Sequence, residues 1–487
     1  MSSLKQKAIS GASWSFTGRI LQQGVQFIIG VILAKLLLPA EYGLVAMALV
    51  FITVFYVFVD SGFSSAIVQK KSVTNSDLST VFYLNMGVSL IVFVILYIGA
   101  PLIANFYKEP QLINIVRVLS VIILLYALTI VQNSIIKRNV DFKLKARIML
   151  VSQVLSGGIA IYLAYAGFGV WALIWKTLLN QVFINIQLWL KNNWFPSLEF
   201  SKVSFNILFA FSSKLLISGI LESVYNQMYR LVVGKFFPAA ELGYYTRAEQ
   251  FKNLPSQTIS NSLMSFLLPV FSKMQEEPER LKKAAKRVIK IVMFFNVNAM
   301  IIMGIIAEPM IEVLLGEKWL PVVPYLQLLV FAGVFYPMHV INVQILTSMG
   351  RSDLFLKIEI IKKIIGMPPI FLGIFVGIKA MIIGMIVTSF ISLFINTYYT
   401  NKLIHLGIVE QLKSISKTFF ISAILAITLF PLVLFLESNV SQLVIIFSVS
   451  ILAFFIVIML SQIMKMEEFY EIKDIIINIK NRNGRQK

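Results

Sequence analysis

Residues 33–43 read LAKLLLPAEYG, and residues 233–243 read VGKFFPAAELG. A lysine, a glutamate and a glycine recur in the two stretches at an offset of 200 positions, as Lys35 and Lys235, Glu41 and Glu241, and Gly43 and Gly243. Each stretch ends one apolar segment, passes through a turn that contains proline, and begins another apolar segment. The pattern therefore predicts two helical hairpins of the same design in different parts of the chain.

The composition of the chain excludes a soluble fold. Of its 487 residues, 58% are hydrophobic and 14% are charged, whereas soluble domains have ~45–50% apolar and ~25% charged residues. So much apolar surface can be covered only by lipid, and we therefore expect an integral membrane protein. The chain has no Cys, which excludes disulfides, thiol catalysis and Cys-ligated metals.

Fourteen apolar segments are long enough to cross a bilayer, which requires about 20 residues in a helix. They are residues 14–38, 42–66, 79–104, 112–136, 146–166, 170–190, 206–232, 241–271, 288–308, 322–347, 354–376, 379–400, 416–437 and 441–464. We therefore expect an all-α polytopic membrane protein with about 14 transmembrane helices.

Positive charges are distributed unevenly among the segments between these spans. The net charge is +20, and with the N-terminus inside, 31 Lys and Arg residues fall in the inner segments and four in the outer ones. This follows the positive-inside rule and accounts for much of the charge without a nucleic-acid partner. Residues 1–12 have no apolar signal region, so we expect the first span to be retained. Both termini are predicted to be cytoplasmic.

The two copies of the hairpin predict how the chain divides into domains. The second copy lies six predicted spans after the first, and an even number preserves orientation. The repeat should therefore be parallel, with its axis along the membrane normal. We expect two six-helix lobes related by a pseudo-twofold axis, residues 1–205 and 206–400. Residues 401–487 would add two helices and a basic cytoplasmic tail.

Several predicted spans carry polar residues on one helical face. The first has Arg19, Gln22 and Gln26 at steps of three and four, and the eighth has Gln250, Asn253 and Gln257 at the same steps. The other candidates for a polar interior are Asp60, Arg117, Lys176, Lys214, Glu222, Asn226, Arg230, Arg247 and Lys252. A charge at the bilayer centre costs ~2.5–3.5 kcal/mol on insertion scales, so such residues usually face a polar interior. We expect two lobes across one hydrated cavity; the alternative is buried ion pairs that join helices.

The acidic residues of the spans are candidates for binding a coupling ion. Asp60, Glu222 and Glu249 are predicted to bind H⁺ or Na⁺, with pairing to neighbouring cations as the alternative. The sequence contains no Walker A motif, no HExxH motif, no Asp-rich metal cluster and no grouping typical of a Ser–His–acid triad. We therefore expect no cofactor, no metal site and no catalytic residue in this chain.

Stretches along most of residues 4–365 resemble one known family. They read LKQKAISGASWSF, LAKLLLPAEYGLVAMALVF, FVDSGFSSAIVQKKS, LSTVFYLN, APLIANFYKEPQL, GFGVWAL, LGYYTRAEQFKNLP and GRSDLFLKIEIIKK. They are similar to the Wzx-type polysaccharide and O-antigen flippases of the multidrug/oligosaccharidyl-lipid/polysaccharide (MOP) exporters. The resemblance implies fourteen helices in two bundles around a cationic cavity, in a bacterial cytoplasmic (inner) membrane. It implies a polyprenyl-diphosphate-linked oligosaccharide as substrate, with a polysaccharide polymerase and chain-length proteins as candidate partners.

The chemistry of such a substrate matches the predicted cavity. A diphosphate-sugar head group is anionic and hydrated, so bare hydrocarbon excludes it, whereas cationic side chains offset phosphates and Gln and Asn bond sugar hydroxyls. We therefore predict a flippase that moves the lipid-linked repeat unit from the inner to the outer leaflet by alternating access. One alternative is a drug/cation antiporter of the same fold, which should have an acidic cavity. Others are a membrane glycosyltransferase or ligase acting on the same lipid, which should have a large outer loop, and a non-transporting scaffold.

Overall fold

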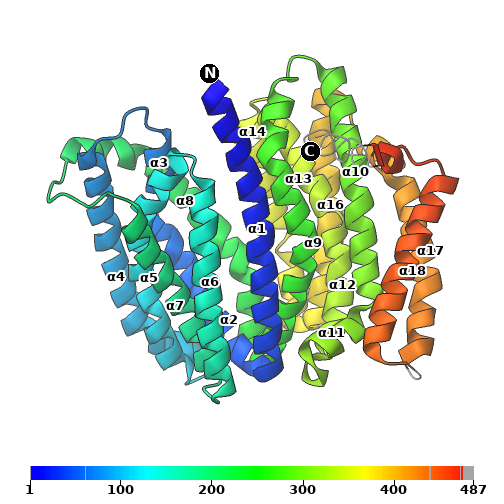
Figure 1. The fold of residues 1–487 in the computed structure, drawn as a ribbon, viewed down its shortest axis with the longest axis horizontal. Helices are drawn as coiled ribbons and strands as arrows, with labels where there is room; N and C mark the ends of the chain where they lie inside the picture. The colour runs from blue at the N-terminus through cyan, green and yellow to red at the C-terminus, as the bar shows by residue number, and fades with distance from the viewer. Residues whose placement is uncertain (1, 61, 438–439, 472, 475–487) are drawn as a thin grey trace, which may run out of the picture. The chain divides into compact units, whose positions relative to one another are not determined.

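The computed structural model describes residues 2–60, 62–437, 440–471 and 473–474. For some residues in this range it describes the backbone alone, namely 2–16, 19, 207–208, 210–211, 214–215, 258–259 and 261–266. The described part of the chain is helical throughout, with short turns between the helices and no strand (Figure 1).

The helices follow one another along the chain as α1 (Ser2–Leu36), α2 (Pro39–Asp60), α3 (Phe63–Gln69), α4 (Asn75–Tyr107), α5 (Leu112–Arg138), α6 (Phe142–Tyr165), α7 (Val170–Lys191), α8 (Lys202–Phe236), α9 (Ala239–Ser272), α10 (Pro278–Ile305), α11 (Ala307–Leu315), the 3₁₀ helix η1 (Glu317–Trp319), α12 (Val322–Val334), α13 (Tyr336–Ser348), α14 (Ser352–Ile365), α15 (Pro368–Phe375), α16 (Ile378–Ile404), α17 (Ile408–Glu437) and α18 (Gln442–Ile463).

Each of the fourteen predicted spans is helical in the structure. Four of them are interrupted: the second comprises α2 and α3, the ninth the end of α10 and the start of α11, the tenth α12 and α13, and the eleventh α14 and α15. Within the described residues, nine helical segments are long and apolar enough to cross a membrane. The predicted all-α polytopic membrane fold is therefore confirmed, while the count of fourteen crossings stays a prediction.

The local sequence explains where several helices begin and break. At the start of α4, Thr74 and Asp77 form a capping box in which each side chain accepts a hydrogen bond from the backbone N–H of the other, at 3.2 and 2.9 Å. Gly62, between α2 and α3, has a φ of 78°, a left-handed conformation that favours glycine. Pro337 stands in the first turn of α13, where a missing N–H leaves no helical hydrogen bond unmade.

The chain forms two compact units that meet in sequence between Thr246 and Arg247. Unit 1 contains α1 to α8 and the first residues of α9, and unit 2 contains the rest of α9 and all later helices. Within unit 1, α4, α5 and α7 run side by side, and α8 packs against α2, α3 and α4 (Figure 1). The predicted lobe boundary at 205/206 is not the boundary of these units, because α8 groups with the earlier helices; the lobes stay a prediction.

The glycines of the two repeated stretches make reciprocal contacts inside unit 1. Any side chain on Gly43 of α2 would overlap the carbonyl oxygen of Ala239, and any side chain on Gly243 of α9 would overlap the carbonyl oxygen of Pro39. Helices approach this closely only where their contact residues are small. Because positions 39 and 43 correspond to 239 and 243 in the repeat, the same surface is used on both helices, as at a two-fold axis.

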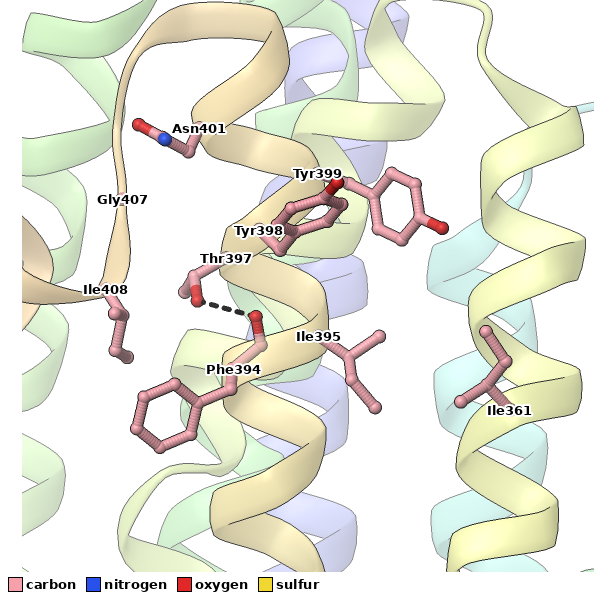
Figure 2. A pocket seen from close by; sticks show the side chains of 9 residues that line it. All are labelled: Ile361, Phe394, Ile395, Thr397, Tyr398, Tyr399, Asn401, Gly407 and Ile408. Carbon is pink, nitrogen blue, oxygen red and sulfur yellow. Dashed lines mark hydrogen bonds between the residues drawn. The ribbon is translucent and has the colours of Figure 1, made fainter.

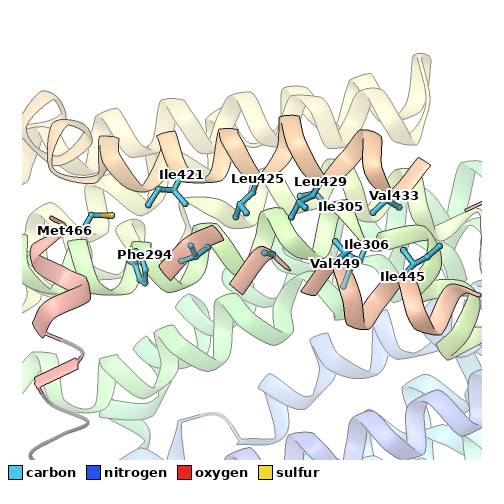
Figure 3. Packing of buried hydrophobic residues seen from close by; sticks show 12 residues of the cluster. Phe294, Ile305, Ile306, Ile421, Leu425, Leu429, Val433, Ile445, Val449 and Met466 are labelled. Atoms are coloured by element: carbon cyan, nitrogen blue, oxygen red, sulfur yellow. The ribbon is translucent and has the colours of Figure 1, made fainter. Parts of the chain in front are cut away.

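Unit 2 has two apolar features, a hollow on its surface and a buried seam between helices. An apolar hollow of about 510 Å³ lies on the surface of α16, between Ile361 of α14 and Ile408 of α17 (Figure 2). A buried seam joins α10, α17 and α18 (Figure 3). Every fourth residue contributes to the seam along α17 and α18, namely Ile421, Leu425, Leu429 and Val433, and Ile445, Val449, Ala453 and Val457. This spacing places each set on one face of its helix.

Ion pairs join the first turns of α10 to two later parts of unit 2. The pairs are Lys282–Glu410 at 2.9 Å, Lys286–Glu410 at 3.1 Å, Arg287–Glu471 at 2.8 Å and Lys290–Glu467 at 2.5 Å. We call these four contacts the α10 clamp. Lys282, Lys286 and Lys290 are spaced by four positions, so they share one face of the helix. The four basic residues of the α10 clamp are therefore paired with glutamates.

Candidate functional site

A polar cavity of about 460 Å³ lies inside unit 1, where α1, α2, α5, α6 and α7 surround it. Five side-chain amides line this cavity: Gln22, Gln26, Gln153, Asn180 and Gln181. We call it the amide cavity. An amide offers a carbonyl acceptor and an NH₂ donor, so five of them can bond several hydroxyl groups at once. Its volume lies within the ~300–1,000 Å³ typical of small-molecule sites.

Lys176 adds a cation to the amide cavity. It precedes Asn180 by one turn of α7, so the two side chains share one face of the helix. Hydroxyl groups come from Tyr42 and Tyr56 of α2 and from Thr177 of α7. A cation next to amides and hydroxyls can bind a molecule that carries both negative charge and hydroxyl groups.

A second cavity, of about 250 Å³, adjoins the first. Its charged residues are Asp60 of α2, Lys137 of α5 and Lys145 of α6, and we call it the carboxylate cavity. Met149, Gln181 and Ile184 line both cavities. The two cavities are therefore neighbours along α6 and α7, and together they form a continuous polar region within one unit.

Some polar atoms of these cavities are available to a ligand. Oδ1 of Asp60 and Oε1 of Gln153 are both buried, and neither has a hydrogen-bond partner in the described part of the chain. A buried oxygen without a partner costs free energy, so a ligand that donates a hydrogen bond or supplies a cation would be stabilised there. Lys137 approaches the same region, where its Nζ donates to Oγ of Ser64 at 3.4 Å.

Weak contacts position the other side chains around the cavities. Nε2 of Gln181 donates to Oγ1 of Thr129 at 3.4 Å, and Oγ of Ser156 donates to Oδ1 of Asn180 at 3.5 Å. Both distances exceed the usual range, so these amides keep most of their hydrogen-bonding capacity for a ligand. Stronger packing comes from aromatic side chains, since the rings of Tyr56 and Tyr126 lie 4.6 Å apart between α2 and α5.

The structure brings four of the predicted cavity residues together. Gln22, Gln26 and Lys176 line the amide cavity, and Asp60 lines the carboxylate cavity. They come from α1, α2 and α7, which are far apart in the sequence. The polar face of the first predicted span therefore does meet a cavity.

The remaining predicted residues lie elsewhere, and their roles stay predictions. Nε of Arg117 donates to the carbonyl of Tyr97 at 3.4 Å, and its guanidinium lies over that ring at 5.0 Å. In unit 2, Arg247 donates to Oε1 of Gln250 at 2.6 Å and lies over the ring of Trp319. Arg230 donates to a neighbouring amide; Glu222 and Asn226 are exposed on α8; and Glu249, Lys252, Asn253 and Gln257 are half-buried on α9. The side chains of Arg19 and Lys214 lie outside the described residues.

Sequence reasoning missed several residues of the cavities. Asn180 follows Lys176 by four positions, and Gln181 follows Thr177 by four positions, so each pair shares a face of α7 and the signal was present in the sequence. Hydropathy predicts Lys137 and Lys145 in an inner segment, because both lie between the apolar spans 112–136 and 146–166. The structure shows that α5 and α6 extend to include them, which places both lysines beside Asp60.

Comparison with known sequences connects this chain to polysaccharide biosynthesis. Residues 32–324 match the family described as "polysaccharide biosynthesis protein". The teichuronic acid biosynthesis protein TuaB of Bacillus subtilis is 25% identical over 73% of this chain and 74% of its own length. The lipopolysaccharide biosynthesis protein WzxC of Escherichia coli is 24% identical over 76% of both chains. The succinoglycan biosynthesis transport protein ExoT of Rhizobium meliloti is 26% identical over 66% of both.

Solved structures show the same fold in two kinds of transporter. The lipid II flippase MurJ, in an inward closed conformation, superposes with a TM-score of 0.74 at 15% identity, over 94% of this chain and 98% of MurJ. An inward-facing multidrug resistance MATE transporter of the MOP superfamily superposes with a TM-score of 0.64 at 17% identity, over 79% of this chain and 94% of its own. At these identities the likeness shows the fold alone.

Proposed function

Because the chain belongs to the family of polysaccharide biosynthesis proteins, as its resemblance to the Wzx-type flippases predicted, we propose that it flips a polyprenyl-diphosphate-linked oligosaccharide from the inner to the outer leaflet of a bacterial cytoplasmic membrane. It is a multi-pass membrane protein; one relative is a succinoglycan biosynthesis transport protein, and the structural neighbours are a lipid II flippase and a multidrug resistance transporter. A polymerase and chain-length proteins would then act on the exported repeat unit.

The amide cavity is the observation that carries this proposal. A lipid-linked oligosaccharide presents sugar hydroxyls beside a diphosphate, and the cavity presents amides beside Lys176. Amides bond hydroxyls through both their donor and acceptor groups, and a lysine ammonium binds phosphate as a point charge. The predicted residues Gln22 and Gln26 would contact sugar, and Lys176 would contact phosphate. Arg19 shares their helical face by spacing and is proposed as a second phosphate contact.

The charge of the two cavities favours an anionic substrate over a cationic drug. Three lysines line them, Lys176, Lys137 and Lys145, against one carboxylate, Asp60. A drug/cation antiporter needs the opposite balance, because a cation is attracted by carboxylates and repelled by ammonium groups. The proposed substrate therefore fits this lining better than the antiporter alternative.

Asp60 is the proposed site of the coupling ion. Its unpaired buried oxygen can accept a proton or contribute to a Na⁺ site, whereas Glu222 is exposed and Glu249 is half-buried. We expect Asp60→Asn to remove the dependence of transport on an imposed H⁺ or Na⁺ gradient, measured as substrate flipping in proteoliposomes. A variant that still responds fully to both gradients would rule Asp60 out.

Alternating access by two six-helix lobes is proposed as the mechanism. The reciprocal contacts of Gly43 and Gly243 support the repeat on which the lobes rest. The predicted orientation can be tested with single cysteines, since the chain has no native Cys to interfere. Membrane-impermeant reagents applied from outside should label cysteines at Lys108 and Lys318, and should not label those at Lys283 and Lys413. Labelling at Lys413 from outside would contradict the topology.

Deletion of the gene tests the function as a whole. The lipid-linked oligosaccharide should then accumulate on the cytoplasmic leaflet, where mass spectrometry of extracted lipids would identify both the sugar and the diphosphate. A plasmid that encodes the intact chain should restore export. If the deleted strain accumulates no lipid-linked sugar and still exports its polysaccharide, the proposal is wrong.

A further inference from the structure

The apolar hollow of unit 2 lies against α16 and is formed by residues of three helices. Phe394, Ile395 and Tyr398 of α16 line it, with Ile361 of α14 and Ile408 of α17. Ile395 points toward the helix that carries Ile361, whereas Phe394 points to the side on which Ile408 lies (Figure 2). All of these residues belong to unit 2, so the hollow is independent of the amide cavity.

The chemistry of the hollow suits a hydrocarbon chain. Apolar side chains and aromatic rings form most of its lining, and Thr397 and Asn401 add polar groups. The hydroxyl of Thr397 already donates to the carbonyls of Leu393 and Phe394. Exposed apolar residues extend the surface along both helices, namely Leu356, Ile360 and Ile364 on α14, and Ile383, Val387, Phe390, Ile391 and Phe394 on α16. In a membrane protein such faces are exposed to lipid.

One end of the hollow is basic. Lys402 is exposed, and its Nζ lies 4.7 Å from the centre of the Tyr398 ring that lines the hollow. Lys357 is also exposed, and it precedes Ile361 by one turn of α14, on the same face. In the predicted topology this end lies at the cytoplasmic surface, where tyrosines and lysines are typical of the membrane interface.

We propose that this hollow binds a phospholipid with an anionic head group, with an acyl chain against Ile361 and Ile395 and the phosphate between Lys357 and Lys402. The charge pattern selects this occupant. An apolar hollow alone would accept any acyl chain, but two exposed lysines at its interfacial end add attraction for a negative head group. Basic pockets between transmembrane helices at the cytoplasmic surface are typical sites for such lipids. The site would bind a lipid of the surrounding membrane, not the transported molecule.

Native mass spectrometry of the detergent-purified full chain tests the site. The protein is titrated with dioleoyl phosphatidylglycerol and, separately, with dioleoyl phosphatidylcholine, which has the same chains but no net charge. We expect tighter binding of phosphatidylglycerol. Lys357→Ala and Lys402→Ala should each reduce that affinity roughly fivefold, and the double variant roughly 25-fold, at ~1 kcal/mol for each lysine. Their affinity for phosphatidylcholine should fall less, because its choline offsets the charge of the phosphate.

Two further variants separate the hollow from its basic end. Ile395→Trp should fill the hollow and weaken both lipids equally, whereas Ile427→Trp, on an exposed part of α17 outside the hollow, should weaken neither. Lys413→Ala is the matched charge control, because Lys413 is an exposed lysine near the start of α17 that does not line the hollow. Equal binding of both lipids by the unmodified chain would overturn the proposal. So would an undiminished preference for phosphatidylglycerol in the Lys357→Ala/Lys402→Ala variant.

Discussion

Asn180 of unit 1 and Asn342 of unit 2 are both amides within apolar helices, but their surroundings differ. Asn180 lines the amide cavity and accepts one long hydrogen bond from Ser156. Asn342 is fully buried and exchanges two hydrogen bonds with Gln411, at 2.9 and 3.0 Å. Its Nδ2 also donates to the carbonyl of Met338 at 2.8 Å. Asn180 therefore keeps most of its hydrogen-bonding capacity for a ligand. The hydrogen bonds of Asn342 instead join α13 to α17.

Side-chain hydrogen bonds also join helices of unit 2 at two other places, although Oδ1 of Asn396, at the first of them, is buried without a hydrogen-bond partner in the described part of the chain. Nδ2 of Asn396 donates to Nδ1 of His339, so the other ring nitrogen donates to Oγ of Ser389, and these contacts join α13 to α16. Oγ of Ser422 donates to Oδ1 of Asn298, which joins α17 to α10. Polar residues within membrane helices therefore have two kinds of role. Some hold helices together, and others line a cavity and are proposed to contact the substrate.

The largest effect is expected from a reversed charge in the amide cavity. Lys176→Glu should reduce transport ~100-fold, because it removes one charge-assisted contact and adds repulsion of the diphosphate. Lys176→Ala removes the contact alone and should reduce transport ~10-fold. Because the proposed role of Lys176 is contact with the substrate, both variants should reach the membrane at normal levels. Flipping in proteoliposomes and protein level by immunoblot measure the two quantities.

A surface lysine provides the control for that experiment. Lys71 is exposed between α3 and α4, and Lys71→Glu changes the net charge of the chain by the same amount. It should transport normally. If Lys176→Glu lowers the protein level as much as it lowers transport, Lys176 stabilises the fold, as the paired amides of unit 2 do. The assignment of the amide cavity to the substrate then fails.

A large effect on stability is expected at the paired amides of unit 2. Gln411→Leu leaves the side chain of Asn342 buried with part of its hydrogen bonding unmade, which should cost ~1–3 kcal/mol of unfolding free energy. Thermal unfolding of the purified chain in detergent would show this as a lower Tm. Transport by the protein that remains folded should be close to normal.

A double substitution shows whether the pair acts as a unit. Asn342→Leu/Gln411→Leu removes both amides, so neither amide is left without the other. The carbonyl of Leu406, which accepts from Nε2 of Gln411 at 3.1 Å, loses that bond in the single Gln411→Leu variant and in the double variant alike. The double variant should be more stable than the sum of the single losses predicts, with a coupling of up to ~1.7 kcal/mol, the largest values measured between membrane helices. Simple addition of the two losses would show that the amides do not depend on each other.

The sequence predicted the helices more completely than the cavities, for physical reasons. Hydropathy reports local composition, and each predicted span is therefore a helix in the structure. A cavity depends on which helices become neighbours, and no local pattern specifies that. The face of Gln22 and Gln26 was recognised from spacing, but Asn180 and Gln181 were missed although their spacing to Lys176 is helical. Hydropathy places Lys137 in a loop because the apolar span ends at residue 136, and apolar composition does not show that α5 continues to Arg138.

A smaller effect is expected from one neutral amide of the cavity. Asn180→Ala should reduce transport roughly three- to tenfold, since a single hydrogen bond contributes ~0.5–1.5 kcal/mol. The Tm should stay the same, because Ser156 already donates to the carbonyl of Gln153 and does not depend on Asn180. Asn396→Ala is the matched control in unit 2, and it should lower the Tm. An equal fall in Tm for both variants would remove the distinction between the units.

The smallest effect is expected where polar residues face water, at the α10 clamp. The hydrogen bond from Lys290 lowers the pKa of Glu467 below its usual value of 4.5. The contact therefore stabilises the fold above that pH and is lost as the pH falls further, when Glu467 becomes protonated. Because Glu467 is largely exposed, water screens the pair, and exposed pairs contribute little. Hydrogen–deuterium exchange of residues 465–471 should rise slightly between pH 5 and about pH 3, after correction for the intrinsic exchange rate. In Glu467→Gln, residues 465–471 should exchange at the higher level at both pH values. If their exchange still rises by the same amount between the two pH values in that variant, another group is responsible.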